Sequence, residues 1–334
     1  MPSPPLIEVR NLKVYFPVRK GIFGKRLYVK AVDGVDVDID HGQILTLVGE
    51  SGCGKTTLGK TICGLYKPTD GKVLYKGKDI TKLSGKEYLM YRRSVQIVHQ
   101  DPFSSLNPTK TVFQTLSVAL KRWGIARTRH ELIDKVSELL ELVGLKPPED
   151  FLFKYPHQLS GGQRQRVVIA RAISVNPELI VADEPITMID VSLRIGILDL
   201  MLDLQKKFKT AYLFITHDFG AARYFSAKGG GLIAVMYLGK IVEIGPAEDV
   251  IHNSLHPYTK VLMSAVPVPD PELSRKKKVI KLRSLDIPSP LNPPTGCKFN
   301  TRCPYVMDIC DKKEPPLIEV RPNHRVACWL YVKK

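Results

Sequence analysis

The chain has 334 residues, of which 44% are hydrophobic and 25% are charged, and this composition excludes a largely disordered protein. Its longest apolar run, residues 232–238, is far shorter than the roughly 20 residues that cross a bilayer, so no membrane span is expected. The N-terminus lacks the pattern of a secretory signal, which favours a cytosolic location. The net charge of +17 suggests an anionic partner: nucleic acid, a membrane surface or a phosphorylated ligand.

Residues 43–65, QILTLVGESGCGKTTLGKTICGL, are typical of a buried strand, a glycine-rich turn and a helix with Leu58, Ile62 and Leu65 on one side. The glycines let the backbone curl so that its amides face a β-phosphate at the start of the helix. Lys55 is expected to reach the β- and γ-phosphates and Thr56 to ligate magnesium, whereas Cys53 is interpreted only as a small residue. The predicted ATP-binding residues here are Gly49, Glu50, Ser51, Gly52, Cys53, Gly54, Lys55, Thr56 and Thr57.

Two further strands are predicted to end in catalytic side chains. Residues 178–185, ELIVADEP, end like a buried parallel strand with carboxylates at its edge. Asp183 is expected to hold the magnesium shell and Glu184 to polarise the attacking water. Residues 211–218, AYLFITHD, place His217 after a third parallel strand, where it is predicted to contact the γ-phosphate.

Residues 101–177 are predicted to form an inserted helical subdomain. Thr128 and Glu131 match a capping box ahead of leucines at helical spacing. The segment ends in LSGGQRQRVVIARAI, where Ser160 is expected to cap a helix whose exposed glycines and amides suit a second phosphate.

GESGCGKTT, QLSGGQRQR, LIVADEP and FITHD, in this order and spacing, resemble the motifs of the ATPase subunits of ABC transporters across about residues 6–250. The resemblance implies an α/β fold: a RecA-like P-loop ATPase core with an N-terminal antiparallel β region. It also implies that two subunits sandwich each ATP between the phosphate loop of one and the signature of the other. The signature residues are Ser160, Gly161, Gly162 and Gln163.

Three further roles follow from the same resemblance. Gln100 matches the residue that touches both magnesium and the transmembrane subunit. Phe16 matches the aromatic that stacks on adenine, with Tyr15 and Tyr28 as alternatives because RKGIFGKRL lengthens this region. Asp190 is retained in the loop after the catalytic glutamate, but TMID replaces the small-residue turn of the family, and this departure suggests a heterodimer with unequal sites.

Beyond residue 250 the composition changes, since residues 251–334 hold 12 of the 25 prolines and are expected to be irregular. This extension resembles that of the peptide-importing subgroup of ABC ATPases, whose members can carry an iron–sulfur cluster on four cysteines. The matching residues are Cys297, Cys303, Cys310 and Cys328. Their spacing alone does not name the metal, so zinc and free thiols or disulfides stay open, with His324 as a substitute ligand.

The resemblance implies the energy-coupling ATPase of an importer, with residues 1–250 as the ATPase domain and 251–334 as the extension. The implied cargo is oligopeptides or dipeptides, with oligosaccharides or nickel as alternatives. The implied cofactors are ATP, Mg²⁺ and a [4Fe-4S] cluster. The implied partners are a second ABC ATPase, two permease subunits and an extracellular or periplasmic substrate-binding protein, at the cytoplasmic face of the membrane.

A rival class is an ABC-type ATPase acting on nucleic acid or ribosomes, which the positive charge would suit. Ribosome-acting members usually carry two cassettes and repair members long coiled coils, whereas this chain has one phosphate loop, one signature and no sustained heptads. A purely structural binding module conflicts with Glu184 and His217. We therefore expect no nucleic-acid partner.

Overall fold

The computed structural model describes residues 4–19, 26–265 and 280–332. The chain divides into two compact units, which are described separately. The first unit comprises Met1–Ile39, Ile44–Thr81 and Thr216–Lys334, and the second comprises Asp40–Gln43 and Lys82–Ile215. Both units mix helices with strands, which confirms the predicted α/β class.

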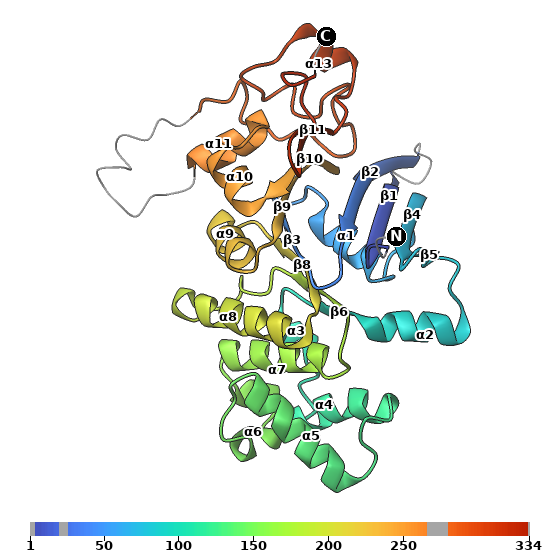
Figure 1. The fold of residues 1–334 in the computed structure, drawn as a ribbon, viewed down its shortest axis with the longest axis vertical. Helices are drawn as coiled ribbons and strands as arrows, with labels where there is room; N and C mark the ends of the chain where they lie inside the picture. Colours follow the sequence, from blue (N-terminus) through green and yellow to red (C-terminus); the bar gives the residue numbers. More distant parts are fainter. Residues whose placement is uncertain (1–3, 20–25, 266–279, 333–334) are drawn as a thin grey trace. The chain divides into compact units, whose positions relative to one another are not determined.

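The first unit begins with a four-stranded antiparallel sheet in the order β2-β1-β4-β5, as expected for the N-terminal region (Figure 1). The strands are β1 (Ile7–Arg19), β2 (Arg26–Ile39), β4 (Asp70–Tyr75) and β5 (Lys78–Asp79). Apolar side chains of β1 and β2, such as Val9 and Val37, are buried, which matches the alternation of a sheet with one solvated face.

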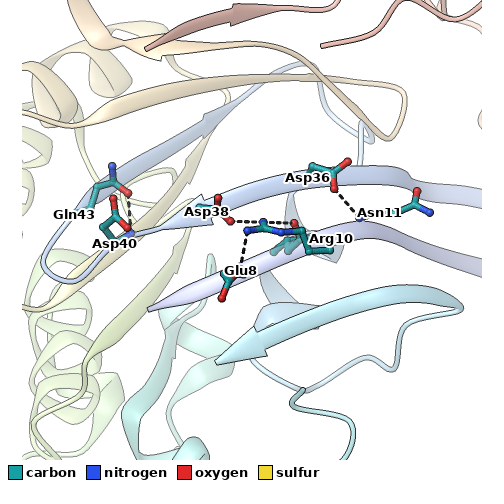
Figure 2. Close-up of polar contacts among 8 residues, drawn as sticks. Glu8, Arg10, Asn11, Asp36, Asp38, Asp40 and Gln43 are labelled. Atoms are coloured by element: carbon teal, nitrogen blue, oxygen red, sulfur yellow. Dashed lines mark hydrogen bonds and ion pairs between the residues drawn. The ribbon is translucent and has the colours of Figure 1, made fainter. Parts of the chain in front are cut away.

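Charged side chains line the polar face of β1 and β2 (Figure 2). Arg10 pairs with Asp38 and, at 2.8 Å, with Glu8. At the adjacent register shift, the backbone amide of Asn11 donates to Asp36 at 2.9 Å. Because the Arg10 and Asp38 side chains are 41% and 42% exposed, their ion pair adds little to the stability of the fold. Its main effect is to make this face of the sheet polar.

The first unit also contains strands in the order β11-β12-β10-β9-β3, in which only β3 and β9 run parallel. The strands are β3 (Ile44–Val48), β9 (Leu232–Tyr237), β10 (Lys240–Pro246), β11 (Ile318–Arg321) and β12 (His324–Val326). The helices are α1 (Lys55–Ile62), α9 (Phe219–Lys228), α10 (Ala247–His252), α11 (Pro257–Ala265) and α13 (Asp308–Lys312). Leu58 and Ile62 of α1 are buried as predicted, but Leu65 is 41% exposed because the helix ends before it.

In residues 251–265 and 280–332 the extension is largely irregular, as expected, but it also adds the hairpin β11–β12 to the edge of β10. Asn323, with φ of 59°, supplies the left-handed turn residue of this hairpin. The fully buried carboxylate of Glu243 on β10 accepts from the amides of Leu255 and His256, at 2.7 and 2.9 Å. It also lies 2.8 Å from Nε2 of His324, so one buried acid joins β10, the start of α11 and the hairpin.

The second unit contains three parallel strands in the order β8-β7-β6 and most of the helices. The strands are β6 (Val95–Val98), β7 (Leu179–Asp183) and β8 (Ala211–Thr216). The α-helices are α2 (Gly85–Ser94), α3 (Pro102–Ser105), α4 (Val112–Arg122), α5 (Arg129–Leu142), α6 (Glu149–Leu152), α7 (Gly161–Ile173) and α8 (Val191–Phe208), and η1 (Pro156–Gln158) is a 3-10 turn.

The predicted helical segment is present, with α4 and α5 packed beside α7 and α6 packed against α4 and α5 (Figure 1). The predicted capping box starts α5, where Thr128 Oγ1 accepts from the Glu131 amide at 3.2 Å and the Glu131 carboxylate accepts from the Thr128 amide. Within the described parts of the chain, no helix has both the length and the apolarity to cross a membrane.

Candidate nucleotide site

The predicted phosphate loop, residues 49–57, curls between β3 and α1 against other backbone. Gly54 has φ of 108°, and a Cβ there would lie 2.0 Å from the Ala31 carbonyl oxygen. A Cβ on Gly49, with φ of 153°, would lie 2.1 Å from the Met236 carbonyl oxygen. Only glycine fits at these two positions, so the loop shape depends on close backbone packing.

Lys55 is the first residue of α1 and crosses back over the loop. Its Nζ donates to the carbonyl oxygens of Gly49 and Glu50 at 2.8 and 3.1 Å, and the residue is 5% exposed. Gly54 at the N-cap provides no side-chain cap, while Thr56 and Thr57 are half-buried in the first turn. An uncapped helix start beside a lysine is an arrangement that suits a phosphate group.

Ser51 and Cys53 of this loop differ in their exposure to solvent. Ser51 is exposed and so is Gly52, but Cys53 is 4% exposed and its Sγ is 3.8 Å from Lys55 Nζ. Burial raises the pKa of the Cys53 thiol, so the thiol is neutral at physiological pH. A buried neutral thiol agrees with the interpretation of Cys53 as a small packing residue.

Glu50 makes two contacts that sequence reasoning missed. Its backbone amide donates to Tyr258 Oη at 2.9 Å, and its carboxylate pairs with both terminal nitrogens of Arg302 at 2.8 and 3.0 Å. Both partners lie in the extension, 208 and 252 residues further along the chain. The resemblance of the extension to the peptide-importing subgroup did not indicate that these two residues contact Glu50.

The carboxyl end of β7 carries Asp183 and Glu184, as predicted. All five residues of β7 are buried, and Asp183 is 4% exposed. The parallel register places Val98 of β6 beside Ala182 of β7. The chain that leaves β6 therefore brings Gln100 to the same edge, where its Nε2 donates to Glu184 Oε2 at 3.4 Å.

Glu184 is held in an uncommon conformation. Its φ of 49° is rare for a residue with a side chain, and its amide donates to the Ile215 carbonyl of β8 at 2.9 Å. The Glu184 carboxylate also accepts from Thr187 Oγ1 at 2.9 Å. Thr187 was not predicted as a site residue, although a hydroxyl three residues after a glutamate is close enough in sequence to donate to its carboxylate across a turn. Strain of this kind often marks a functional residue.

The remaining ATP candidates belong to the first unit. His217 follows β8 and is exposed, next to Asp218, which caps α9 by accepting from the Gly220 amide at 2.8 Å. Phe16 is 36% exposed and packs edge-on to Tyr66, with ring centroids 5.4 Å apart. Tyr28 is 44% exposed, whereas the Tyr15 hydroxyl donates to Asp33. Lys30 Nζ also lies 5.8 Å from the centroid of the Tyr15 ring. Residues 20–25 of the lengthened segment lie outside the described residues.

The signature residues begin α7 with a capping box. Ser160 Oγ accepts from the Gln163 amide at 3.3 Å, and the Ser160 amide donates to Gln163 Oε1 at 3.0 Å. Gly162 is buried, with a Leu193 methyl group 3.2 Å from where its Cβ would lie, and Gly161 is half-buried. The expectation that these glycines are exposed is therefore wrong.

The turn after Glu184 exposes one of its two unusual residues and buries the other. Met188 is 53% exposed, whereas Ile189 is 4% exposed and packs inward. Asp190 is exposed at the N-cap of α8 without a side-chain cap hydrogen bond. Of the two residues that depart from the family pattern, only Met188 therefore adds exposed bulk.

The predicted iron–sulfur ligands are buried or half-buried in the extension. Cys303, Cys310 and Cys328 are 7–8% exposed, and the Cys297 amide donates to the Cys310 carbonyl at 2.7 Å. Burial raises the pKa of Cys297 to about 12 and that of Cys328 to about 11. Nearby cysteines also raise these pKa values: Cys303, Cys310 and Cys328 act on Cys297, and Cys303 and Cys310 act on Cys328. Among the described residues, however, no three or more His, Cys, Asp or Glu side chains have a metal-binding arrangement. The geometry thus does not support the cluster prediction.

Sequence comparison assigns two segments to known families. Residues 32–187 match the ABC transporter family, and residues 242–310 match the C-terminal region of oligopeptide/dipeptide transporters. The chain is 47% identical to the oligopeptide transport ATP-binding protein AppF of Bacillus subtilis, covering 98% of this chain and 97% of that protein. It is 42% identical to the oligopeptide transport ATP-binding protein OppF of Salmonella typhimurium, covering 97% and 95%.

Solved structures with a similar fold are ATP-binding cassettes. CbiO1 of Clostridium perfringens, part of an ABC transporter complex, matches with a TM-score of 0.61 at 25% identity, covering 74% of this chain and 91% of that one. The cassette MJ0796, a dimer bound to ADP and phosphate, matches with a TM-score of 0.61 at 28% identity, covering 72% and 98%. The chain is an ABC-type ATPase and belongs to the oligopeptide transport ATP-binding proteins of the ABC transporter family.

Proposed function

We propose that this ATPase drives import of oligopeptides or dipeptides and that it binds MgATP at the phosphate loop. The observation that carries the binding site is the curl of residues 49–57 around Lys55 at an uncapped helix start. Backbone amides and a lysine ammonium are the groups that recognise phosphates in such loops. Thr56 and Asp183 would hold the magnesium ion, which offsets charge on the phosphates when it is bound.

Glu184 is the proposed base that orients and polarises water for in-line attack on the γ-phosphate. Thr187 and Gln100 both donate to its Oε2, which orients the carboxylate. Gln100 would also meet magnesium and the permease. His217 is the proposed contact to the γ-phosphate from the next strand, and Phe16 is the proposed platform for adenine.

A dimer completes each site in this proposal. The signature, Ser160 to Gln163, presents the start of α7 to the ATP of the opposite subunit, and Asp190 lies in the turn at that contact. Because Met188 is exposed where the family usually has a small residue, we propose a heterodimer with a second ABC ATPase whose two sites differ.

The names of the relatives and the match of residues 242–310 support peptides as cargo, over the oligosaccharide and nickel alternatives. The proposed assembly contains two permease subunits and an external substrate-binding protein, with this chain peripheral at the cytoplasmic face. Residues 1–250 would form the ATPase domain and residues 251–334 the extension.

Reconstitution of the complete importer in vesicles tests this function. ATP inside the vesicles should drive uptake of a labelled oligopeptide, and Glu184→Gln in this subunit should stop that uptake. Glu178→Gln, at the opposite end of β7, is the matched control. ATP-driven uptake of an oligosaccharide or Ni²⁺ with no uptake of peptide would contradict the peptide assignment.

The four cysteines of the extension remain a proposed iron–sulfur site. What supports the proposal is that a 2.7 Å backbone hydrogen bond joins Cys297 to Cys310 and that Cys303, Cys310 and Cys328 are all buried in the extension. Protein purified without oxygen should be brown, with about four iron and four sulfide per chain, and Cys303→Ser should lose the colour. Colourless protein holding one zinc, or no metal, would replace this proposal with a zinc site or with free thiols.

A further inference from the structure

Glu50, the second residue of the phosphate loop, is held by a partly buried ion pair with Arg302 of the cysteine segment, residues 296–310. Arg302 Nη1 lies 2.8 Å from Glu50 Oε2, and Arg302 Nη2 lies 3.0 Å from Glu50 Oε1. The side chains are 6% and 23% exposed. A two-pronged pair of this kind fixes orientation as well as distance, because guanidinium and carboxylate are both planar.

Arg302 is itself held firmly. Its guanidinium lies 5.8 Å from the ring centroids of Tyr237 and Phe299, and Nη1 also donates to Tyr237 Oη at 3.4 Å. Its amide donates to the Phe299 carbonyl at 3.0 Å. Phe299 and Cys303 belong to the same buried cluster as Val48, the last residue of β3. The arginine is therefore anchored to the core of the unit that contains the phosphate loop.

A second contact from the extension holds the backbone of the same glutamate. Tyr258 Oη accepts from the Glu50 amide at 2.9 Å, and Tyr258 is 1% exposed between Tyr237 and Phe299, with centroids at 4.6 and 5.3 Å. The carbonyl of Glu50 in turn accepts from Lys55 Nζ at 3.1 Å. Side chain, amide and carbonyl of Glu50 are thus all bonded, and the last bond leads directly to the phosphate-binding lysine.

We propose that Arg302 is a positioning residue for ATP binding: it holds Glu50, and through Glu50 it fixes the loop backbone and Lys55 for the triphosphate. The cysteine segment then acts as a brace of the nucleotide site, in addition to any metal it binds. This inference rests on the proposed role of the phosphate loop as the ATP site. Tyr258 supports the same residue from the backbone side.

The test measures Mg-ATP binding to the full chain by calorimetry and the kcat and KM for ATP of the assembled importer. Arg302→Met removes the charge and the fork but keeps an apolar stem of similar length. We expect the Kd for ATP to rise about tenfold and the KM to rise by the same factor, with kcat little changed. The reason is that paired, charge-assisted hydrogen bonds are among the stronger hydrogen bonds in proteins. Arg302→Lys keeps the charge without the fork and should recover part of the affinity.

A double-variant cycle separates positioning from general damage. If Arg302 acts through Glu50, the double variant Arg302→Met with Glu50→Gln should have a Kd for ATP no higher than that of whichever single variant binds ATP more weakly. Glu314→Gln is the matched control, since it breaks a 2.6 Å ion pair between the extension and Lys240 that does not involve the loop. Its Kd for ATP should equal that of the wild type.

The results distinguish this inference from the site on which it rests. Wild-type Kd in Arg302→Met, together with weak binding in Lys55→Ala, would overturn the inference alone. Unchanged binding in Lys55→Ala would overturn the site. Full additivity of the Arg302 and Glu50 effects would also contradict positioning through Glu50. If Arg302→Met does not fold, the same cycle with Arg302→Lys decides the question.

Discussion

The phosphate loop and the carboxyl end of β7 hold their functional groups in different ways. At the phosphate loop, backbone atoms lie against backbone atoms, and Glu50 is fixed by Tyr258 and Arg302 from the extension. At the end of β7, side chains from adjacent strands and turns meet, and Glu184 is fixed by Thr187 and Gln100.

This difference predicts how each region responds to substitution. A conservative change at the β7 edge alters chemistry while the strand stays buried and paired. The phosphate loop, in contrast, depends on its shape, so a change in its charged or supporting residues should act first on nucleotide affinity. Enzyme kinetics separates these two kinds of effect, because a change at the β7 edge should lower kcat and a change at the phosphate loop should raise KM.

Glu184→Gln should give the largest effect, since the amide keeps the shape but removes the base. We expect kcat for ATP to fall by roughly 10²–10⁴-fold, the usual contribution of a general base, with ATP still bound. Steady-state ATPase assays and nucleotide calorimetry measure both quantities. Glu178→Gln should retain normal turnover, and normal turnover in Glu184→Gln itself would remove Glu184 from the mechanism.

Lys55→Ala should come next and act on affinity. Loss of a charge-assisted hydrogen bond of about 1.5–3 kcal/mol corresponds to roughly 10–150-fold in Kd for ATP. Lys60→Ala, on the last turn of the same helix, tests whether loss of any lysine from α1 has this effect. Equal losses in the two variants would contradict a specific role for Lys55.

Thr187→Val should give a smaller effect at the β7 edge. The substitution keeps the volume but removes the 2.9 Å hydrogen bond to Glu184, so kcat should fall by about fivefold, equivalent to about 1 kcal/mol. ATP affinity should not change. A rise in KM without a fall in kcat would show that Thr187 serves binding instead of carboxylate orientation.

Cys53→Ala should give the smallest effect. Burial raises the pKa of this thiol, so deprotonation needs a higher pH than for a free cysteine and the neutral form dominates at pH 7. Kd for ATP should stay within about twofold of wild type, and thiol alkylation at pH 7 should be slow. Fast alkylation of Cys53 with loss of ATP binding would reveal a reactive thiol.

The β7 edge could be predicted from the sequence because its determinants are local. Buried parallel strands give continuous apolar runs, so Asp183 and Glu184 follow from the strand prediction at residues 178–185, whereas Gln100 was assigned from the family resemblance. The φ of Glu184 could not be predicted, because a positive φ at a glutamate is set by the turn around it. The same local rules gave the caps at Thr128 and Ser160.

The supports of the phosphate loop could not be predicted, since they depend on contacts over long sequence separations. Tyr258 and Arg302 come from a proline-rich extension without a periodic apolar pattern. The hairpin β11–β12 was likewise missed, because its pairing to β10 is stabilised by the buried pair of Glu243 and His324, 81 residues apart. Four cysteines predicted a metal from residue type, but spacing alone does not fix where thiols lie.

The ion pair between Glu50 and Arg302 has a consequence for synthesis of the protein. A ribosome finishes every ATPase motif before it adds Arg302, which follows Glu50 by 252 residues. If Arg302 positions the loop as proposed, a nascent chain arrested at residue 250 should be retained less well on immobilised ATP than the released full chain. Translation to the C-terminal cysteines would then be a step in which the ATPase matures, so that an unfinished subunit does not compete for nucleotide.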